Sequence, residues 1–254
     1  ISSFSGSGTT YTATFTPSGD GACTIDVAAD TFTDAGGNNN IAATQFNWTY
    51  DGTKPTMTIT SSTSGVTDGS TTNNGSIGLT FTSSEITTDF VVGDISVSNG
   101  TISSFSGSGT TYTATFTPSG SGACTIDVGA NTFTDAAGNN NTAATQFNWT
   151  YDGTRPTMTI TSSTSGVTDG SSTTNSSIGL IFTSSETTTN FISGSVTVSN
   201  GSISGFSGSG TTYTATFTPT GDGACTIDVY ANSFTDAVGN YNIASSQFNW
   251  TKLA

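Results

Sequence analysis

An internal repeat of 101 residues is the feature that most constrains what this chain can fold into. The run ISSFSGSGTTYTATFTP begins at Ile1, returns at Ile102, and returns with one changed residue at Ile203. No residue is gained or lost between the copies. Solenoid and propeller repeats span roughly 20 to 50 residues, so a unit of this length corresponds instead to one small independently folding domain. We therefore expect domains arranged one after another, like beads on a string.

The segment DGTKP, and its later copy DGTRP, marks the boundary between repeats. Asp-Gly favours a turn, and the following Pro cannot donate to a strand ladder, so it suits the first residue of a strand. We place the boundaries before Lys54 and Arg155. Residues 54–154 and 155–254 are then complete repeats, and residues 1–53 are the C-terminal half of another.

The half-repeat of residues 1–53 carries half of a hydrophobic core. Its alternating apolar residues include Phe15 and Trp48. Exposing this face would leave several hundred Å² of apolar surface, which is more than a monomer usually tolerates. We expect the half to lie in a full seven-strand sandwich, completed either by preceding sequence or by strands added from a neighbouring chain.

Apolar residues alternate with Thr or Ser through most of a repeat, which is typical of β-strands. Gly, Asn, Asp and Ser clusters separate these segments. Seven short strands in about 100 residues, with one apolar face, indicate an all-β fold of tandem immunoglobulin-like antiparallel β-sandwiches. The paired cysteines and central Trp of antibody domains are missing. In the second repeat the predicted strands cover residues 57–60, 77–81, 90–97 with a break at Gly93, 102–105, 112–116, 124–128 and 147–151.

The linker DGTKP, the strand motifs YTATFTP and GACTIDV, and the loop FTDAAGNNN occur in all or most copies. On these motifs the whole chain resembles the bacterial immunoglobulin-like repeats of large surface proteins and adhesins. The resemblance implies extracellular stalks that extend a binding tip or build a surface layer. It also implies calcium at domain junctions, as several relatives bind it there.

The charge balance excludes several classes of partner. The only basic residues are Lys54, Arg155 and Lys252, against 17 acids, so the net charge is -14. No basic patch can neutralise phosphates, which argues against nucleic acid and anionic membrane surfaces as partners. No apolar run is long enough for a membrane span, so membrane insertion is not expected. The chain contains no His, and no catalytic constellation is recognisable, so we expect no enzyme.

Each repeat contains one cysteine, namely Cys23, Cys124 and Cys225. One thiol cannot form a bridge within its own domain. Cys124 is in phase with Ile126 and Val128, so we expect it to face the core as a buried, unpaired thiol. A disulfide between chains is the alternative.

Acidic residues gather where the linker enters each complete repeat. In a seven-strand sandwich the loops nearest the incoming linker share one pole, and three carboxylates plus neutral oxygens suit a calcium ion. The alternative is ordinary capping, in which Asp and Asn bond neighbouring backbone amides. Glycoside hydrolysis would need a carboxyl with a raised pKa, and we expect none of these acids to have apolar surroundings. The candidate calcium ligands are Asp51, Glu85, Asp135 and Asn139 at one junction, and Asp152, Glu186, Asp236 and Asn240 at the next.

The repeat changes at its C-terminal end. Lys252 and Leu253 stand where the preceding repeat has Tyr151 and Asp152. We therefore expect residues 155–254 to be the terminal repeat of this array, without a calcium site at the far pole.

Taken together, these patterns predict a structural segment of an extracellular fibre, stalk or surface-layer protein, located at the cell surface or secreted. The expected partners are adjacent repeats and neighbouring copies of the same chain. The alternative is an adhesive or carbohydrate-binding module that contacts a surface glycan. That role would use exposed loop aromatics, of which Tyr241 is the main example.

Overall fold

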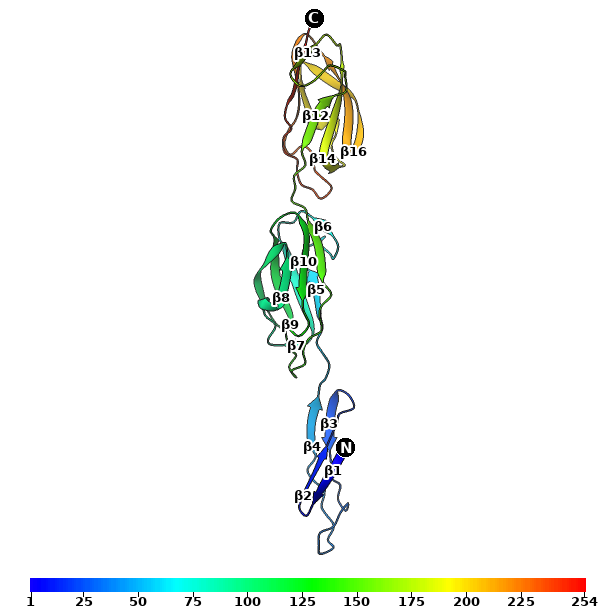
Figure 1. Ribbon diagram of the computed structural model, residues 1–254, viewed down its shortest axis with the longest axis vertical. Helices are drawn as coiled ribbons and strands as arrows, with labels where there is room; N and C mark the ends of the chain where they lie inside the picture. The colour runs from blue at the N-terminus through cyan, green and yellow to red at the C-terminus, as the bar shows by residue number, and fades with distance from the viewer.

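The computed structural model describes residues 1–254 as three units arranged end to end (Figure 1). The linker enters each complete unit at one pole, and the chain leaves from the opposite pole. Strands form nearly all of the regular structure. The exceptions are two 3₁₀ turns, η1 (Val92–Asp94) and η2 (Ser193–Ser195). No helix in the structure has the length and apolar character needed to cross a bilayer.

The second repeat is a sandwich of two sheets. One sheet has the strand order β5-β7-β9 and the other has the order β6-β11-β10-β8. All pairs are antiparallel except β6 with β11, which is parallel. The strands are β5 (Met57–Ser61), β6 (Thr71–Thr72), β7 (Ile77–Thr87), β8 (Ile95–Ser98), β9 (Gly100–Pro118), β10 (Gly122–Val128) and β11 (Phe147–Tyr151).

The third repeat has the same architecture, with sheets β12-β14-β16 and β13-β18-β17-β15. This follows from the sequence, since its apolar positions repeat those of the second. Its strands are β12 (Met158–Ser162), β13 (Ser171–Thr173), β14 (Ile178–Thr188), β15 (Val196–Ser199), β16 (Gly201–Pro219), β17 (Gly223–Val229) and β18 (Phe248–Lys252).

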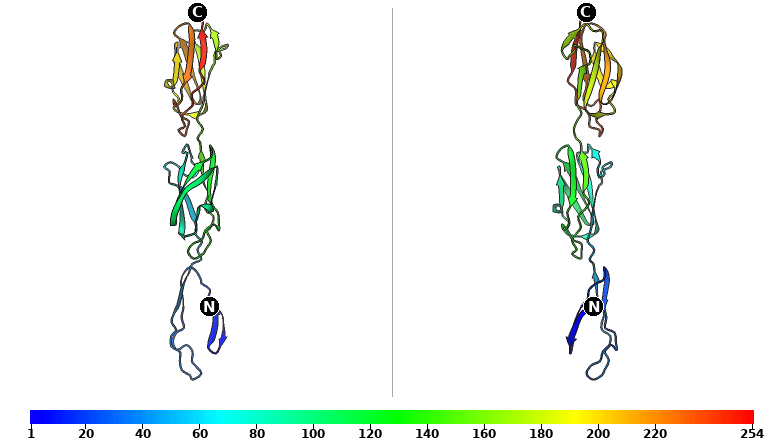
Figure 2. Two further views of the ribbon diagram at one scale, coloured as in Figure 1. Left: turned by 90° about the vertical axis from the view of Figure 1, so that its left-hand side faces the viewer. Right: turned by 45° about the vertical axis from the view of Figure 1, so that its right-hand side comes forward.

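The first unit contains only two strand pairs, β1 with β2 and β3 with β4. Figure 2 shows the β1–β2 hairpin standing apart from the β3–β4 ribbon. These strands correspond to β9, β10 and β11 of the second repeat, so the unit lacks counterparts of β5 to β8. Their bounds are β1 (Ser2–Ser7), β2 (Thr10–Thr14), β3 (Gly21–Ile25) and β4 (Phe46–Tyr50).

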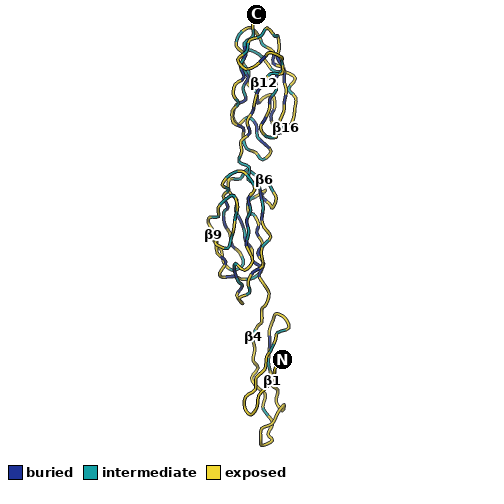
Figure 3. Tube along the Cα trace, viewed as in Figure 1, coloured by how far each residue is buried: buried dark blue, intermediate teal, exposed yellow.

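Each complete repeat has one hydrophobic core of 16 buried residues between its two sheets. Alternate side chains of each strand point inward, which is why the period-two pattern locates the core. Figure 3 shows this contrast between the buried sandwich interiors and the exposed first unit. Phe81, Phe116 and Cys124 are fully buried in the second repeat. The three thiols are buried, which confirms that the cysteines face the core.

The all-β immunoglobulin-like prediction is confirmed, but two details of the strand assignment were wrong. Residues 90–94 were expected to begin a strand and instead lead into the 3₁₀ turn η1, so that β8 begins at Ile95. The two strands predicted at 102–105 and 112–116 lie in β9 and pack against each other as a hairpin, as their counterparts β1 and β2 do in the first unit. The two-residue edge strand β6 was missed, because two Thr residues carry no apolar alternation.

A tight turn within β9 separates these two segments. In the first unit the same sequence folds as the hairpin β1–β2, with Gly6 opposite Tyr11. In the second repeat a Cβ on Gly107 would lie 2.4 Å from the Thr111 carbonyl oxygen and 2.5 Å from the Tyr112 Cα. Its φ of +139° is also unfavourable for any other residue. Glycine is therefore required where the backbone of the hairpin approaches itself.

Candidate functional site

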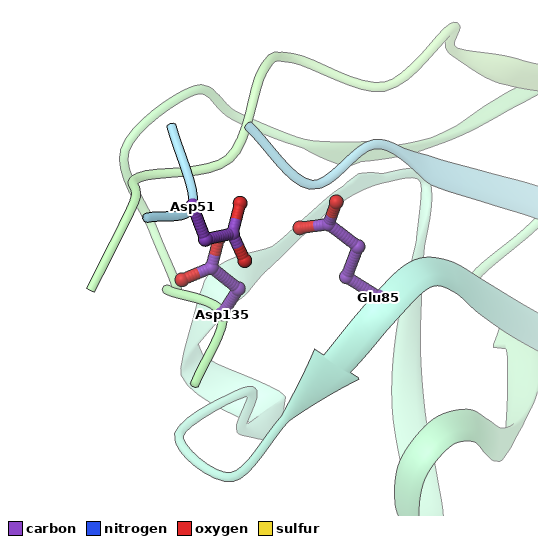
Figure 4. A group of neighbouring side chains, drawn as sticks. All are labelled: Asp51, Glu85 and Asp135. Carbon is purple, nitrogen blue, oxygen red and sulfur yellow. The ribbon is translucent and has the colours of Figure 1, made fainter. Parts of the chain in front are cut away.

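Three carboxylates meet at the pole where the linker enters each complete repeat. Asp51 lies in the linker after β4, Glu85 lies near the end of β7, and Asp135 lies in the loop between β10 and β11 (Figure 4). One oxygen from each lies within 4.8 Å of the others. At the next junction, one oxygen from each of Asp152, Glu186 and Asp236 also lies within 4.8 Å of the others. The structure therefore assembles both sets of acids that the sequence singled out.

The loop carrying Asp135 is organised around this side chain. Oδ1 of Asp135 accepts hydrogen bonds from the backbone N–H of Ala137 at 2.8 Å and of Asn139 at 2.9 Å. Oδ2 accepts from Asn139 Nδ2 at 2.9 Å. Burial raises the pKa of Asp135, but these hydrogen bonds outweigh burial and leave the pKa below its ordinary value. Asp135 is therefore held as a fixed carboxylate, as a capping role requires.

Asn139 joins the cluster through its amide nitrogen. Besides Asp135, Nδ2 donates to the backbone carbonyl oxygen of Asp51 at 3.1 Å. At the next junction Asn240 Nδ2 donates to the Asp152 carbonyl oxygen at 2.9 Å. The expected amide-oxygen ligand is thus, in this structure, a donor that ties the linker to the pole of the repeat.

Glu85 has a different environment from Asp135. Its Oε2 atom is buried and has no hydrogen-bond partner. The same is true of Oε2 of Glu186. Burial raises the pKa of Glu85, and the nearby charges of Asp51 and Asp135 raise it further. The same causes raise the pKa of Glu186. The expectation that Glu85 is a solvated loop acid was therefore wrong, because Glu85 lies on strand β7 and is half-buried.

No Lys or Arg side chain forms a salt bridge with either cluster. The one salt bridge in the structure joins Lys252 to Asp222 at 3.2 Å, away from both clusters. Three carboxylates with an unpartnered buried oxygen fit a hard cation, which takes oxygen ligands. The small hollows of the structure, about 170 Å³ beside Asp68 and about 140 Å³ beside Asp169, lie elsewhere.

The linker is also held from the preceding repeat, by residues that sequence reasoning missed. Asp20 Oδ1 accepts from the Gly52 N–H at 2.7 Å, and its other oxygen accepts from the Thr53 hydroxyl. At the next junction Ser121 Oγ accepts from the Gly153 N–H at 3.0 Å. No sequence signal marks these contacts, since they join loop residues more than 30 positions apart.

Arg155 makes the second junction different from the first. Its Nε donates to the Tyr241 carbonyl oxygen at 2.8 Å, and one terminal nitrogen donates to Asn232 Oδ1 and the Asn242 carbonyl oxygen, both at 2.9 Å. Lys54, at the same position of the preceding repeat, makes no hydrogen bond or salt bridge. The planar fork of Arg allows this bonding, which a single ammonium cannot reproduce.

A family model described as a bacterial Ig-like domain matches residues 1–50, 51–151 and 152–251. These three matches cover nearly the whole chain with the same period as the internal repeat. The second and third matches begin three residues before Lys54 and Arg155. The repeat boundaries that we place before Lys54 and Arg155 stay predictions. A search of curated proteins finds no match.

The solved structures that match this chain include bacterial adhesins and a surface-layer protein. The structure of invasin, a bacterial integrin-binding protein, is 14% identical to this chain, with a TM-score of 0.43. The match covers 92% of this chain and 53% of the invasin chain. The C-terminal domain of the BspA polypeptide of Streptococcus agalactiae has 8% identity and a TM-score of 0.39, with coverages of 78% and 100%. Domains 5 and 6 of the S-layer protein SbsC have 16% identity and a TM-score of 0.23, with coverages of 79% and 100%. This chain spans about half of the invasin chain.

Proposed function

We propose a structural role for this chain, which belongs to the bacterial Ig-like domain family: it spaces or assembles parts of an extracellular fibre, stalk or surface layer. The observation that carries the proposal is the fastening of each linker to the pole of the following repeat. Asn139 and Asn240 bond the backbone of linker residues Asp51 and Asp152. Linkers held in this way keep successive repeats in line and do not behave as flexible tethers.

The surface location is supported by the kinds of protein that share this fold. Similar domains occur in adhesin and S-layer proteins. The net charge of -14 also disfavours nucleic-acid partners. A role without catalysis agrees with the absence of His from the sequence.

Calcium is the ion that we propose for the two carboxylate clusters. Asp51, Glu85 and Asp135 would supply oxygen ligands at one junction, and their counterparts would do so at the next. A divalent cation would relieve the repulsion that raises the Glu85 pKa and would satisfy its unpartnered Oε2. Because Asp51 belongs to the linker, an ion bound there would add a further tie between adjacent repeats.

Small-angle scattering of the full chain, with calcium and with chelator, tests both proposals. We expect a long, narrow particle with calcium and a broader distribution of interdomain distances with chelator. The double substitution Glu85→Gln and Glu186→Gln should remove the calcium response without unfolding the repeats. Asp30→Asn is a matched control, because Asp30 is exposed and outside both clusters. A compact or randomly bent particle in calcium would contradict the spacing role, and identical profiles with and without calcium would contradict the calcium sites alone.

One observation favours the adhesive role as a second candidate. The third repeat carries Tyr230, Tyr241 and Ile243 where the second has Gly129, Asn140 and Thr142. All three side chains are exposed, and both Tyr rings are more than half exposed. Hydrogen bonds of the intervening Asn242 to the carbonyl oxygens of Tyr230 and Ile243 hold their backbones close. Exposed loop tyrosines are typical of binding surfaces.

Binding of the chain to a glycan array tests this second candidate. The double variant Tyr230→Gly and Tyr241→Asn restores the residues of the second repeat and should abolish any specific binding. Equal binding by the wild-type chain and this variant would exclude the tyrosines as the contact.

A further inference from the structure

One loop of the second repeat combines a reactive pair of residues with an open backbone. The pair is Asn74–Gly75, in the loop between β6 and β7. Asparagine followed by glycine is prone to lose its side-chain amide, because glycine has no Cβ to hinder attack by its own backbone nitrogen. The third repeat has Ser176 at the position of Gly75, so its copy of the loop lacks the pair.

The backbone and the side chain of this pair are free to react. The Gly75 N–H makes no hydrogen bond, and a Cβ on Gly75 would meet no atom within 4 Å. The Asn74 side chain also makes no hydrogen bond, and the backbone N–H of Asn74 donates to Thr72 Oγ1 at 3.3 Å. No contact therefore holds the amide carbon of Asn74 away from the Gly75 nitrogen.

Two other Asn–Gly pairs, Asn99–Gly100 and Asn200–Gly201, are restrained by the fold. The side-chain amide of each asparagine donates to a backbone carbonyl oxygen, at 2.9 Å in the first pair and 3.1 Å in the second. Each glycine begins a long strand and packs against a Phe ring, where a Cβ would lie 2.3 Å from a ring carbon. Cyclisation at either pair requires the strand to open locally, which keeps these asparagines intact for longer.

We propose that Asn74 is a site of spontaneous modification, at which the side-chain amide becomes a carboxylate. The Gly75 nitrogen bonds to the side-chain carbonyl carbon of Asn74 and gives up its proton. The bond from that carbon to the amide nitrogen breaks, ammonia leaves with the proton, and a succinimide ring remains. Water then opens the ring to aspartate or isoaspartate. Water replaces ammonia without any oxidant or enzyme, and the chain gains one negative charge.

The new charge would lie at the junction between the second and third repeats. Figure 1 shows β6 at the end of the second repeat that faces the third. The Thr72 carbonyl oxygen, at the end of β6, accepts from the backbone N–H of linker residue Asp152 at 3.0 Å. Asn73 Nδ2 lies 3.5 Å from the position that a Cβ on Gly239 would take, in a loop of the third repeat. The loop of Asn74 therefore adjoins both the linker and the following repeat.

A carboxylate at position 74 would weaken this junction. Asp152 and Asp236 already belong to a cluster of three acids there. No Lys or Arg side chain forms a salt bridge with that cluster. A further negative charge in the adjoining loop increases the repulsion between the two repeats. The second junction would consequently loosen as the chain ages.

Incubation of the intact chain in oxygen-18 water at mildly alkaline pH, followed by peptide mapping, tests the modification. Oxygen-18 marks the carboxylates that form during the incubation. We expect conversion of Asn74 to be at least about tenfold faster than that of Asn99 and Asn200, because those two depend on local opening. In denaturant all three should convert at similar rates, since the residue pair is the same. The control Gly75→Ser copies the third repeat and should keep Asn74 as the amide.

Equal conversion of Asn74, Asn99 and Asn200 in the folded chain would overturn the proposal. A preference for Asn74 that persists in denaturant would also overturn it, since the fold would then not be the cause.

The effect on the junction is measured on Asn74→Asp, in chelator, by pulsed electron spin resonance between labels on the second and third repeats. We expect a broader distribution of distances than in the unmodified chain. Asn175→Asp is the matched control, because it makes the same change in the loop at the far pole of the third repeat. An unchanged distribution in Asn74→Asp would overturn the proposed weakening of the junction.

Discussion

At the scale of single residues, Glu85 and Asp135 show how neighbouring carboxyls of one cluster acquire opposite pKa shifts. Asp135 is buried but accepts hydrogen bonds from Asn139 and Ala137, which stabilise its charged form. Glu85 has a buried oxygen without a partner, so burial and its acidic neighbours favour its protonated form. Hydrogen bonding, more than the number of nearby charges, decides which acid keeps its proton.

These shifts predict an unusual dependence of stability on pH for the calcium-free chain. Glu85 and Glu186 have folded pKa values above the ordinary 4.5, so the stability they contribute is complete below 4.5 and is lost as pH rises through the folded values. Asp135 and Asp236 have values below the ordinary 3.8, so their contribution is lost as pH falls through the folded values. In chelator, the melting temperature should therefore be higher near pH 4.5 than at pH 7 and should fall in strong acid.

The variant Glu85→Gln with Glu186→Gln checks this assignment. Its melting temperature should no longer rise between pH 7 and about pH 4.5, while the loss in strong acid should remain. If the double variant keeps the full rise, other groups are responsible for it.

The three thiols should differ in reactivity. Cys124 and Cys225 are fully buried within complete sandwiches, whereas Cys23 is 9% exposed on the open first unit. Burial also raises the pKa of the Cys124 and Cys225 thiols, which lowers the fraction of reactive thiolate. We expect a thiol reagent to modify Cys23 first and the other two only on unfolding. Peptide mapping after timed labelling measures the order, and equal rates at all three sites would contradict it.

At the scale of structural elements, the long loop between β10 and β11 depends on one buried amide. Asn141 is 1% exposed, and its Oδ1 accepts from the backbone N–H groups of Thr132 and Phe133. Its Nδ2 donates to the carbonyl oxygens of Gly129 and Thr142. The side chain thus replaces strand pairing inside the loop and holds the segment that carries Asp135.

We expect Asn141→Ala to destabilise the second repeat by about 3 kcal/mol, because several buried backbone groups lose their partner. Chemical denaturation followed by the fluorescence of Trp149 measures the loss. Asn140→Ala is the matched control, since Asn140 is exposed and its side chain makes no hydrogen bond. Equal effects of the two substitutions would show that the network does not support the loop.

At the scale of the whole molecule, the two junctions are built from the same sequence pattern but are fastened differently. The second junction has Arg155 bonded to the loop of residues 232–242, and Lys54 makes no such contact at the first. The first junction instead has the charged Asp20 bonded to its linker, where the second has Ser121. Near-identical repeats can therefore give junctions of unequal stiffness.

The substitution Arg155→Lys should loosen the second junction selectively. Lysine keeps the charge but loses the geometry that reaches three acceptors, so the distribution of distances between the second and third repeats should broaden. Pulsed electron spin resonance between labels on those repeats measures this distribution. Lys54→Gln is the control and should leave the first junction unchanged. An unaltered distribution in the Arg155 variant would show that other contacts set the stiffness.

The sequence by itself determined the period, the all-β class and the core. Strand side chains alternate strictly, so residues such as Phe81, Phe116 and Cys124 could be assigned to the interior from their spacing alone. The acids of both clusters could also be anticipated, because sandwich topology places particular loops at one pole. These features depend on local pattern and on the order of strands.

Only the tertiary structure decided the details that depend on distant partners. The close approach of the two arms of β9 requires glycine at position 107, and the edge strand β6 exists only because β11 lies beside it. The raised pKa of Glu85 depends on burial beneath a linker, and the hold of Asp20 on Gly52 spans 32 positions. Burial, electrostatics and hydrogen bonds between loops follow from where the folded backbone brings residues together, which local periodicity does not encode.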